Sequence, residues 1–172
     1  MLSDKGITIE SITPGSIAEA AGLHAGDIVC DINGSPMRDV IDFMFHKDED
    51  ELNVCFRRDG AKKKISILSD SGADLGISFK PLNVKICKNN CIFCFVKQLP
   101  KGLRKPLYIK DEDYRLSFLY GNYTTLSNIT AEEKKRIVEQ RLSPMYISVH
   151  TTNRLLRNRM LGNPKATDIL KE

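Results

Sequence analysis

Three cysteines stand close together near the middle of the chain, in the run ICKNNCIFCF. Cys87, Cys91 and Cys94 follow the spacing C-x3-C-x2-C, and the aromatic Phe93 directly precedes the third. Three thiolates on one loop can hold three corners of a 4Fe-4S cluster, which leaves the fourth iron without a protein ligand. An open metal position is typical of catalytic sites rather than closed structural ones. The spacing therefore predicts an iron–sulfur catalyst.

Two other interpretations of these cysteines remain open. A zinc site needs four ligands, usually supplied as two cysteine pairs, and the sequence has no second CxxC pair. His46 or His150 would have to complete such a site from a distant part of the chain. The other interpretation is that the three thiols are free and unrelated.

The remaining two cysteines are expected to be structural. Cys30 alternates with Ile28 and Ile32 on one face of a predicted strand, so it should be a small buried residue. Cys55 should lie on the face opposite its apolar neighbours in the run LNVCF. An odd total of five cysteines argues against a disulfide framework and for a reducing compartment.

The composition of the 172-residue chain is that of a globular protein, with 41% apolar and 28% charged residues. No apolar run approaches the length of a membrane span, and the opening residues MLSDKGITIE lack the apolar segment of a signal peptide. We therefore expect a cytoplasmic protein with no membrane partner.

Charge is distributed unevenly along the chain. Residues 1–70 hold 8 Lys and Arg against 13 Asp and Glu, whereas residues 80–172 hold 18 against 8. Opposite balances in the two halves indicate two modules, which we place at residues 1–70 and 75–172. The basic half is either a solvated surface or an attraction for a nucleic-acid substrate, and charge alone does not decide between them.

The first module is predicted to be a small mixed-β domain. Asn33-Gly34 and Asp59-Gly60 stand between alternating apolar runs, which is a strong hairpin signal. The expected strands and short helices are GITIESI, residues 16–21, DIVCDI, residues 37–45, LNVCFRR and KKKISIL.

The string PGSIAEAAGLHAGDIVCDINGSPM in this module resembles bacterial PDZ domains. The resemblance implies binding of a peptide C-terminus, whose carboxylate would meet a backbone loop at Leu2 to Gly6. The acidic run from Lys47 to Glu51 would repel such a carboxylate. A docking or linker module for the second half is an equal alternative.

The second module is predicted to contain parallel strands separated by helices. The expected strands are Pro81 to Ile86, Arg115 to Tyr120 and Met145 to Val149. A helix should begin at the T-x-x-E capping box of Thr130, and another should run from Asn153. In such sheets the chemistry lies at the carboxyl ends of the strands, where the cysteines and the runs GNY and SVH fall.

The cysteine spacing with its aromatic residue resembles the radical S-adenosylmethionine (SAM) superfamily. The resemblance implies a 4Fe-4S cluster and SAM as cofactors, with Phe93 against the adenine. It implies a backbone contact to the amino group of SAM from the GNY element, in which Gly121 matches the family and Asn122 departs from it. The segment ISVHTTN resembles the third-strand region of RNA-modifying members, where Ser148 and Asn153 would contact SAM.

Taken together, the order of a PDZ-like domain, CKNNCIFCF and SPMYISVHTT resembles a family of PDZ-containing radical SAM proteins described as iron–sulfur oxidoreductases. This implies an α/β fold with the first half of a parallel (β/α) barrel, and a flavodoxin-like or ferredoxin-like protein as reductant. Because only three strands are expected, the chain looks truncated, and its catalytic residues and substrate stay unknown. The alternatives are a closed structural or electron-transfer cluster, or a PDZ-type interaction protein.

Overall fold

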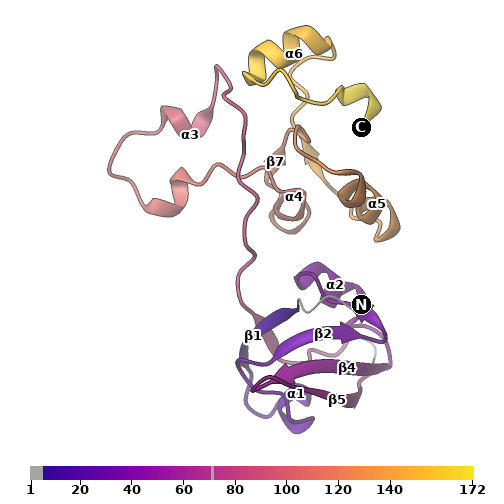
Figure 1. Ribbon diagram of the computed structural model, residues 1–172. Helices are drawn as coiled ribbons and strands as arrows, with labels where there is room; N and C mark the ends of the chain where they lie inside the picture. The colour runs from indigo at the N-terminus through magenta and orange to yellow at the C-terminus, as the bar shows by residue number, and fades with distance from the viewer. Residues whose placement is uncertain (1–5, 71) are drawn as a thin grey trace. The chain divides into compact units, whose positions relative to one another are not determined.

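The computed structural model describes residues 6–70 and 72–172, and the chain divides into two compact units, Met1–Leu82 and Asn83–Glu172 (Figure 1). The first unit is built on one sheet with the strand order β5-β4-β2-β1-β6, and β3 pairs with β2. Its elements are β1 (Ile7–Ile12), α1 (Ile17–Ala20), β2 (Ile28–Ile32), β3 (Ser35–Pro36), α2 (Val40–His46), β4 (Glu51–Arg58), β5 (Ala61–Leu68) and β6 (Ile77–Phe79).

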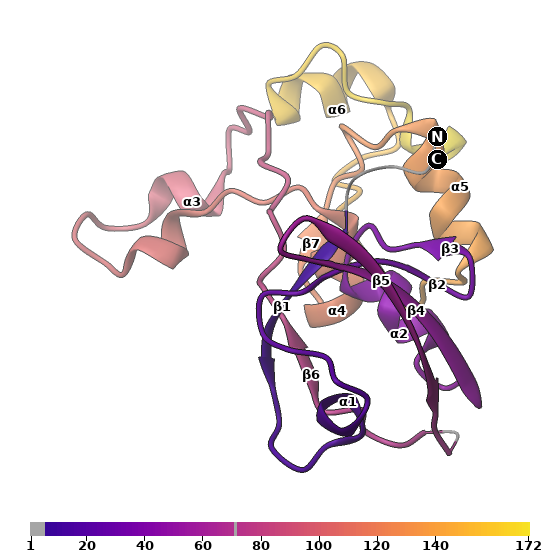
Figure 2. The same ribbon diagram turned by 60° about the horizontal axis from the view of Figure 1, so that its bottom comes forward.

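The longest strands of this sheet, β4 and β5, form a hairpin and lie side by side (Figure 2). Their register is unbroken from Glu51 opposite Leu68 to Arg58 opposite Ala61. The two-residue turn has positive φ at both Asp59 and Gly60, as the turns that match the twist of a hairpin require. The predicted hairpin is thus confirmed.

The core of the first unit comes from alternate residues of the sheet and from the two helices. Ile9, Leu23 and Leu52 are almost fully buried, and Phe43 of α2 packs edge-on against Phe79 of β6 with ring centroids 4.8 Å apart. Burial of such side chains contributes about 1.5–3 kcal/mol each relative to exposure. The predicted mixed-β module is therefore confirmed. The expected carboxylate loop at Leu2 to Gly6 lies, apart from Gly6, outside the described residues.

The expectation that Cys30 is buried was wrong. Cys55 is buried and only 1% exposed, whereas Cys30 is half-buried. The register between β2 and β4 shifts between Val29 and Asp31, so Cys30 has no residue opposite it on β4. An irregularity of this kind changes which face the following side chains occupy, and simple alternation fails there.

The second unit contains mostly helices and long connections. Its elements are α3 (Phe95–Gln98), the 3-10 helix η1 (Lys105–Tyr108), α4 (Tyr114–Tyr120), β7 (Tyr123–Thr124), α5 (Ala131–Glu139), β8 (Tyr146–Ile147), α6 (Arg154–Leu161) and the 3-10 helix η2 (Ile169–Lys171). Strands β7 and β8 pair in parallel, with Tyr123 opposite Tyr146. The predicted parallel pairing is present, but the sheet has two short strands and does not close, so the expected half-barrel is not shown.

Two of the three strands expected in this unit are absent. Residues 81–86 form no strand and contribute a single bridge, between Ile86 and Asp111. The run RLSFLY is the helix α4, because Asp113 accepts from the backbone N–H of Arg115 at its start and Gly121 adopts left-handed φ at its end. A short apolar run does not distinguish a strand from a helix, and here the caps decide.

The two predicted helices are confirmed with their caps. Thr130 and Glu133 form the expected capping box at the start of α5, and Asn153 caps α6 by accepting from the N–H of Leu156. The described residues include no helix long and apolar enough to cross a membrane.

Candidate metal centre

The three clustered cysteines lie on a loop without regular structure that ends at α3. The backbone N–H of Cys87 donates to the carbonyl of Lys110 at 2.7 Å, which fixes the start of the loop. Cys94 is the N-cap residue of α3, so it fixes the end. The loop therefore lies between a neighbouring strand-like segment and a helix start.

The end of α6 supports the middle of this loop. The N–H of Asn90 donates to the carbonyl of Leu161 at 2.9 Å, and that of Ile92 donates to Met160 at 3.1 Å. The last carbonyls of a helix have no partner within the helix, so they are available to bind another segment. The loop satisfies two of them and is held against α6 in return.

Asn89, between the first two cysteines, connects the loop to the rest of the unit. Its side chain is only 3% exposed, and its amide donates to Thr125 Oγ1 at 3.1 Å and to Ser127 Oγ at 2.8 Å. Its amide oxygen accepts from Asn163 Nδ2 at 2.7 Å. Lys110 Nζ donates to the backbone carbonyl of Asn89 at 2.7 Å. A buried amide that is satisfied on both sides fixes one arrangement of its neighbours.

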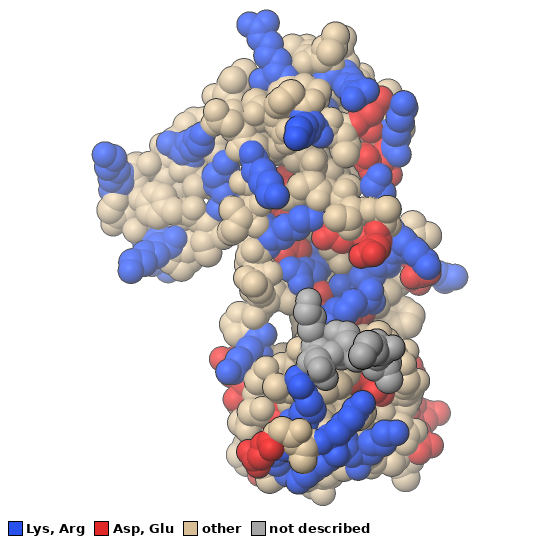
Figure 3. All heavy atoms as spheres, viewed as in Figure 1, with Lys and Arg blue, Asp and Glu red and all other residues tan. Residues whose placement is uncertain are grey.

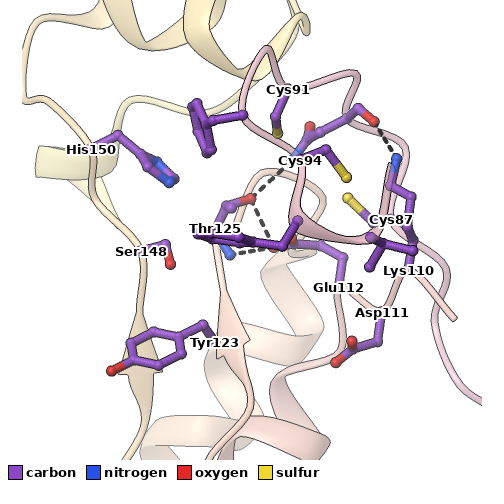
Figure 4. A pocket seen from close by; sticks show the side chains of 14 residues that line it. Cys87, Cys91, Cys94, Lys110, Asp111, Glu112, Tyr123, Thr125, Ser148 and His150 are labelled. Carbon is purple, nitrogen blue, oxygen red and sulfur yellow. Dashed lines mark hydrogen bonds between the residues drawn. The ribbon is translucent and has the colours of Figure 1, made fainter. Parts of the chain in front are cut away.

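The three cysteines line one cavity of about 490 Å³, which is within the usual range for ligand sites. In Figure 4 the side chains of Cys87 and Cys94 point toward one another, with Cys91 close by on the same loop. Phe93 and Ser148 also line this cavity. The structure thus brings five of the predicted site residues to one pocket.

The surroundings of Cys87 and Cys91 favour the neutral form of these two thiols. Burial raises the pKa of Cys87, and burial followed by the neighbouring Cys87 and Cys94 raises the pKa of Cys91. Mutual repulsion of this kind disfavours several thiolates in one place unless a cation joins them. Binding of metal would displace the protons.

The donor set has the chemistry that an iron–sulfur cluster requires. Across residues 6–70 and 72–172, no three His, Cys, Asp or Glu side chains are arranged to hold one metal ion. Thiolates are the ligands that such a cluster takes. Three free thiols on one pocket wall match that requirement in type and number.

Charged groups of both signs lie in the same pocket. Glu112 is 3% exposed, and one of its carboxylate oxygens accepts from the Thr124 hydroxyl at 2.7 Å and from the Thr125 N–H at 2.6 Å. Lys110 and Asp111 line the pocket beside it. The pocket can therefore receive a ligand that carries both an ammonium and a carboxylate.

His150 lies on the opposite wall, against the predicted adenine-contacting residue. Its ring is 4.6 Å from that of Phe93, and its backbone has left-handed φ. Burial and the nearby Arg157 lower the pKa of His150, so the ring is neutral at pH 7. Arg157 is itself 1% exposed and donates to the carbonyls of Val149 and Thr167, which ties together segments that follow β8 and α6.

Three predicted SAM contacts lie outside the residues that line the pocket. Gly121 ends α4, Asn122 donates to the Asp111 carboxylate at 3.0 Å, and Asn153 caps α6. Tyr123, next in the chain, does line the pocket. The structure therefore gives these three residues a local structural role, while their contact with SAM stays a prediction.

No local pattern in the sequence predicts Asn89, Lys110 and Glu112 as site residues. Asn89 occupies one of the variable positions of the cysteine motif, and the other two lie in the polar run KDED. The residues they contact are separated from them by up to 74 positions. Only the folded arrangement brings them to the site.

Comparison with known proteins separates the two parts of the chain. Residues 69–172 match the radical SAM-like domain family, and residues 2–44 match the PDZ domain family. No curated protein matches the chain.

Several solved structures are similar to part of the chain. The HtrA3 PDZ domain bound to a phage-derived ligand is 27% identical, and the match covers 38% of this chain and 64% of that one, with a TM-score of 0.36. The PDZ domain of the SdrC-like protein from Listeria monocytogenes is 20% identical, with coverage of 46% and 92% and a TM-score of 0.37. GtR34C from Geobacillus thermodenitrificans is 26% identical, with coverage of 41% and 84% and a TM-score of 0.33.

Proposed function

The chain belongs to the radical SAM-like domain family, and we propose that it is an iron–sulfur enzyme that cleaves SAM reductively. Cys87, Cys91 and Cys94 hold a 4Fe-4S cluster in this proposal. The observation that carries it is that all three thiols line one cavity together with groups that suit SAM. A cluster held by these three thiols alone would leave one metal position open to SAM.

When bound, the cluster supplies one electron to the sulfonium of SAM, which splits into methionine and a 5′-deoxyadenosyl radical that abstracts hydrogen from a substrate. The protein binds and orients SAM and the substrate, and it excludes water from the site. The methionine part of SAM is a zwitterion, and the buried Glu112 and the nearby Lys110 offer it both charges. Phe93 and the neutral His150 present flat rings to the adenine.

The proposal extends to the remaining predicted residues and modules. Ser148 lines the cavity and would be a polar contact for SAM. Gly121, Asn122 and Asn153 would contact SAM through their backbone or act on it through neighbouring residues. The catalytic module is the second unit, residues 83–172, and the PDZ-like module is the first unit, residues 1–82, because β6 pairs with β1 in its sheet. An oxidoreductase of this kind draws its electron from a flavodoxin-like or ferredoxin-like protein.

The test is anaerobic reconstitution of the full chain with iron and sulfide, followed by electron paramagnetic resonance of the reduced protein. We expect a 4Fe-4S signal that changes when SAM is added, because SAM ligates the open iron. A signal that does not change when SAM is added would identify a closed electron-transfer cluster. One zinc per chain without sulfide would overturn both iron interpretations.

A second candidate function is peptide binding by the first unit, and the position of β6 favours it. Strand β6 is the last in the sheet order, and Phe79 on it contacts Phe43 of α2. A peptide that adds to an edge strand gains backbone hydrogen bonds along its length. In the loop before β6, the Asp74 carboxylate already accepts from the N–H of Gly76 at 2.9 Å. Asp74 would therefore compete with the carboxylate of a bound peptide for this N–H.

Fluorescence anisotropy of a labelled peptide with an apolar free C-terminus, against its amide, tests this second function on the full chain. Peptide binding predicts a clear preference for the free carboxylate. It also predicts tighter binding by Asp74→Ala, because the competing carboxylate is removed. Equal affinity for acid and amide would eliminate recognition of a C-terminus.

A further inference from the structure

A protruding segment of the second unit follows directly on the third cysteine. We name residues 95–110 the basic arm. It comprises α3, η1 and their connection, and it projects away from α4, α5 and α6 in both ribbon views (Figures 1 and 2). None of its residues is buried. The arm is held mainly by its own contacts, such as the Leu103 N–H to the Tyr108 hydroxyl at 2.9 Å.

The arm carries charge of one sign only. It holds five Lys and Arg and no Asp or Glu: Lys97, Lys101, Arg104, Lys105 and Lys110. All but Lys110 are exposed. Figure 3 shows blue side chains at its outer part and no red ones among them. Such a surface attracts an anionic partner over a distance and raises its rate of encounter.

Apolar side chains lie exposed between these charges. Phe95 is 81% exposed, and Leu103, Leu107 and Ile109 are each more than 40% exposed. Exposed apolar groups surrounded by charged ones are typical of protein interaction surfaces, since a purely solvated segment gains nothing from them. The arm therefore fits an acidic protein that also presents apolar contacts.

The arm begins at the proposed cluster. Cys94 is the N-cap of α3, and Phe95 and Val96 of the arm line the cavity with the three cysteines. A protein seated on the arm would thus lie next to a cluster ligand. Small, polar and transient interfaces are the usual kind for electron transfer between proteins.

We infer that the basic arm is the docking surface for the protein that reduces the cluster, an acidic one-electron carrier with an iron–sulfur or flavin centre. This inference rests on the proposed function. In the step itself the carrier loses one electron and the cluster gains one, with no bond made or broken. Opposite charge brings the partner to the arm, and the apolar side chains hold it beside Cys94.

The test measures reduction of the reconstituted full chain by stopped-flow absorbance, with a reduced acidic plant-type ferredoxin as the probe. The arm variant reverses the charge of the arm at three positions and carries Lys101→Glu, Arg104→Glu and Lys105→Glu. The matched control Lys135→Glu, Arg141→Glu, Lys171→Glu makes the same change in net charge at exposed positions elsewhere in the unit. Dithionite serves as a small reductant that needs no docking.

We expect the second-order rate with ferredoxin at low salt to fall about tenfold or more in the arm variant and to change far less in the control. Dithionite should reduce all three proteins alike. An equal loss of rate in both variants would show that the effect depends only on net charge, which would overturn the inference. An unchanged rate in the arm variant would overturn it as well.

Two further measurements keep the outcomes separate. If the wild-type chain takes up no cluster, the proposed function fails. Ferredoxin binding to the unloaded chain then tests the docking surface alone. Loss of binding in the arm variant supports the surface, and equal binding by wild type and variant overturns it. If the arm variant loses binding of a labelled single-stranded RNA while its ferredoxin rate is unchanged, the arm is a nucleic-acid surface instead.

Discussion

Gly162, the C-cap of α6, lies directly against the backbone carbonyl of Asn90 in the cysteine loop. A Cβ atom at Gly162 would lie 2.9 Å from the carbonyl carbon of Asn90 and closer still to its oxygen. Real Cβ atoms do not approach backbone so closely, so only glycine allows the loop its hydrogen bonds to the end of α6. The position of the cysteines depends on this contact.

We predict that Gly162→Ala displaces the cysteine loop and lowers the iron retained after reconstitution by at least half. The matched control is Gly121→Ala, because Gly121 is also a left-handed C-cap, while its Cβ would meet only the Tyr146 ring at 3.5 Å. Both variants incur the cost of left-handed backbone, about 1 kcal/mol. Iron retained equally by both would mean that the Asn90 contact does not position the loop.

The Asn89 side chain is predicted to stabilise the second unit as well as the site. Removing a buried amide leaves its partners unsatisfied, at a cost of about 1–3 kcal/mol, so Asn89→Ala should lower the free energy of unfolding by that amount. Urea titration followed by tyrosine fluorescence isolates this unit, because all five tyrosines lie in residues 83–172.

Asn163→Ala is the comparison for this variant, since it removes the bond to the Asn89 amide oxygen, together with a local bond that the Asn163 amide oxygen accepts from the Lys165 N–H at 3.0 Å. It should cost about half as much as Asn89→Ala. One further measurement distinguishes a purely structural role of Asn89 from a role in positioning the cluster. If Asn89 positions the cluster, the iron that Asn89→Ala still binds should have an altered paramagnetic resonance spectrum. A normal spectrum on a destabilised protein would leave only the structural role.

Local signals in the sequence predicted the first unit well and the second unit less well. Asn33-Gly34 and Asp59-Gly60 specify their turns within two residues, and Ser16, Thr130 and Asn153 cap their helices within three. The run RLSFLY is a helix and not the predicted strand, because its apolar residues fit both periods and the Asp113 cap decides between them. The contacts of Asn89 and Glu112 join distant segments, and no local pattern encodes them.

Asp113 links the start of α4 to the segment before the cysteines and should give the second unit an acid-sensitive stability. Burial alone would raise its pKa, but bonds from Arg115 at 2.6 and 2.9 Å and from the Lys85 N–H at 3.0 Å outweigh burial and lower it. A carboxyl whose folded pKa is depressed contributes stability above its unfolded pKa, about 3.9. That contribution is lost as pH falls below about 4.

Asp113→Asn should therefore lower the unfolding free energy by about 2–3 kcal/mol at pH 7, and the difference from wild type should shrink below pH 4. Tyrosine-detected urea titrations at pH 7 and pH 3 measure both values. Glu139→Gln is the control, because its ion pair with Lys135 at 3.6 Å is exposed and should contribute at most about 0.5 kcal/mol. A difference that is independent of pH would rule out the charge as the cause.

The last prediction concerns the proposed cluster ligands. Cys91→Ala removes one of three thiols and should abolish most iron and sulfide binding after anaerobic reconstitution, because a cluster cannot stay attached at two corners. Cys30→Ala should keep its full iron content, since Cys30 lies in the first unit, half-buried on β2, where its thiol donates to the Ile28 carbonyl at 3.4 Å. Iron and sulfide per chain, measured by colorimetric assay, compare the two. Full iron in the Cys91 variant would overturn the assignment of the site, and equal loss in both would point to a defect in folding.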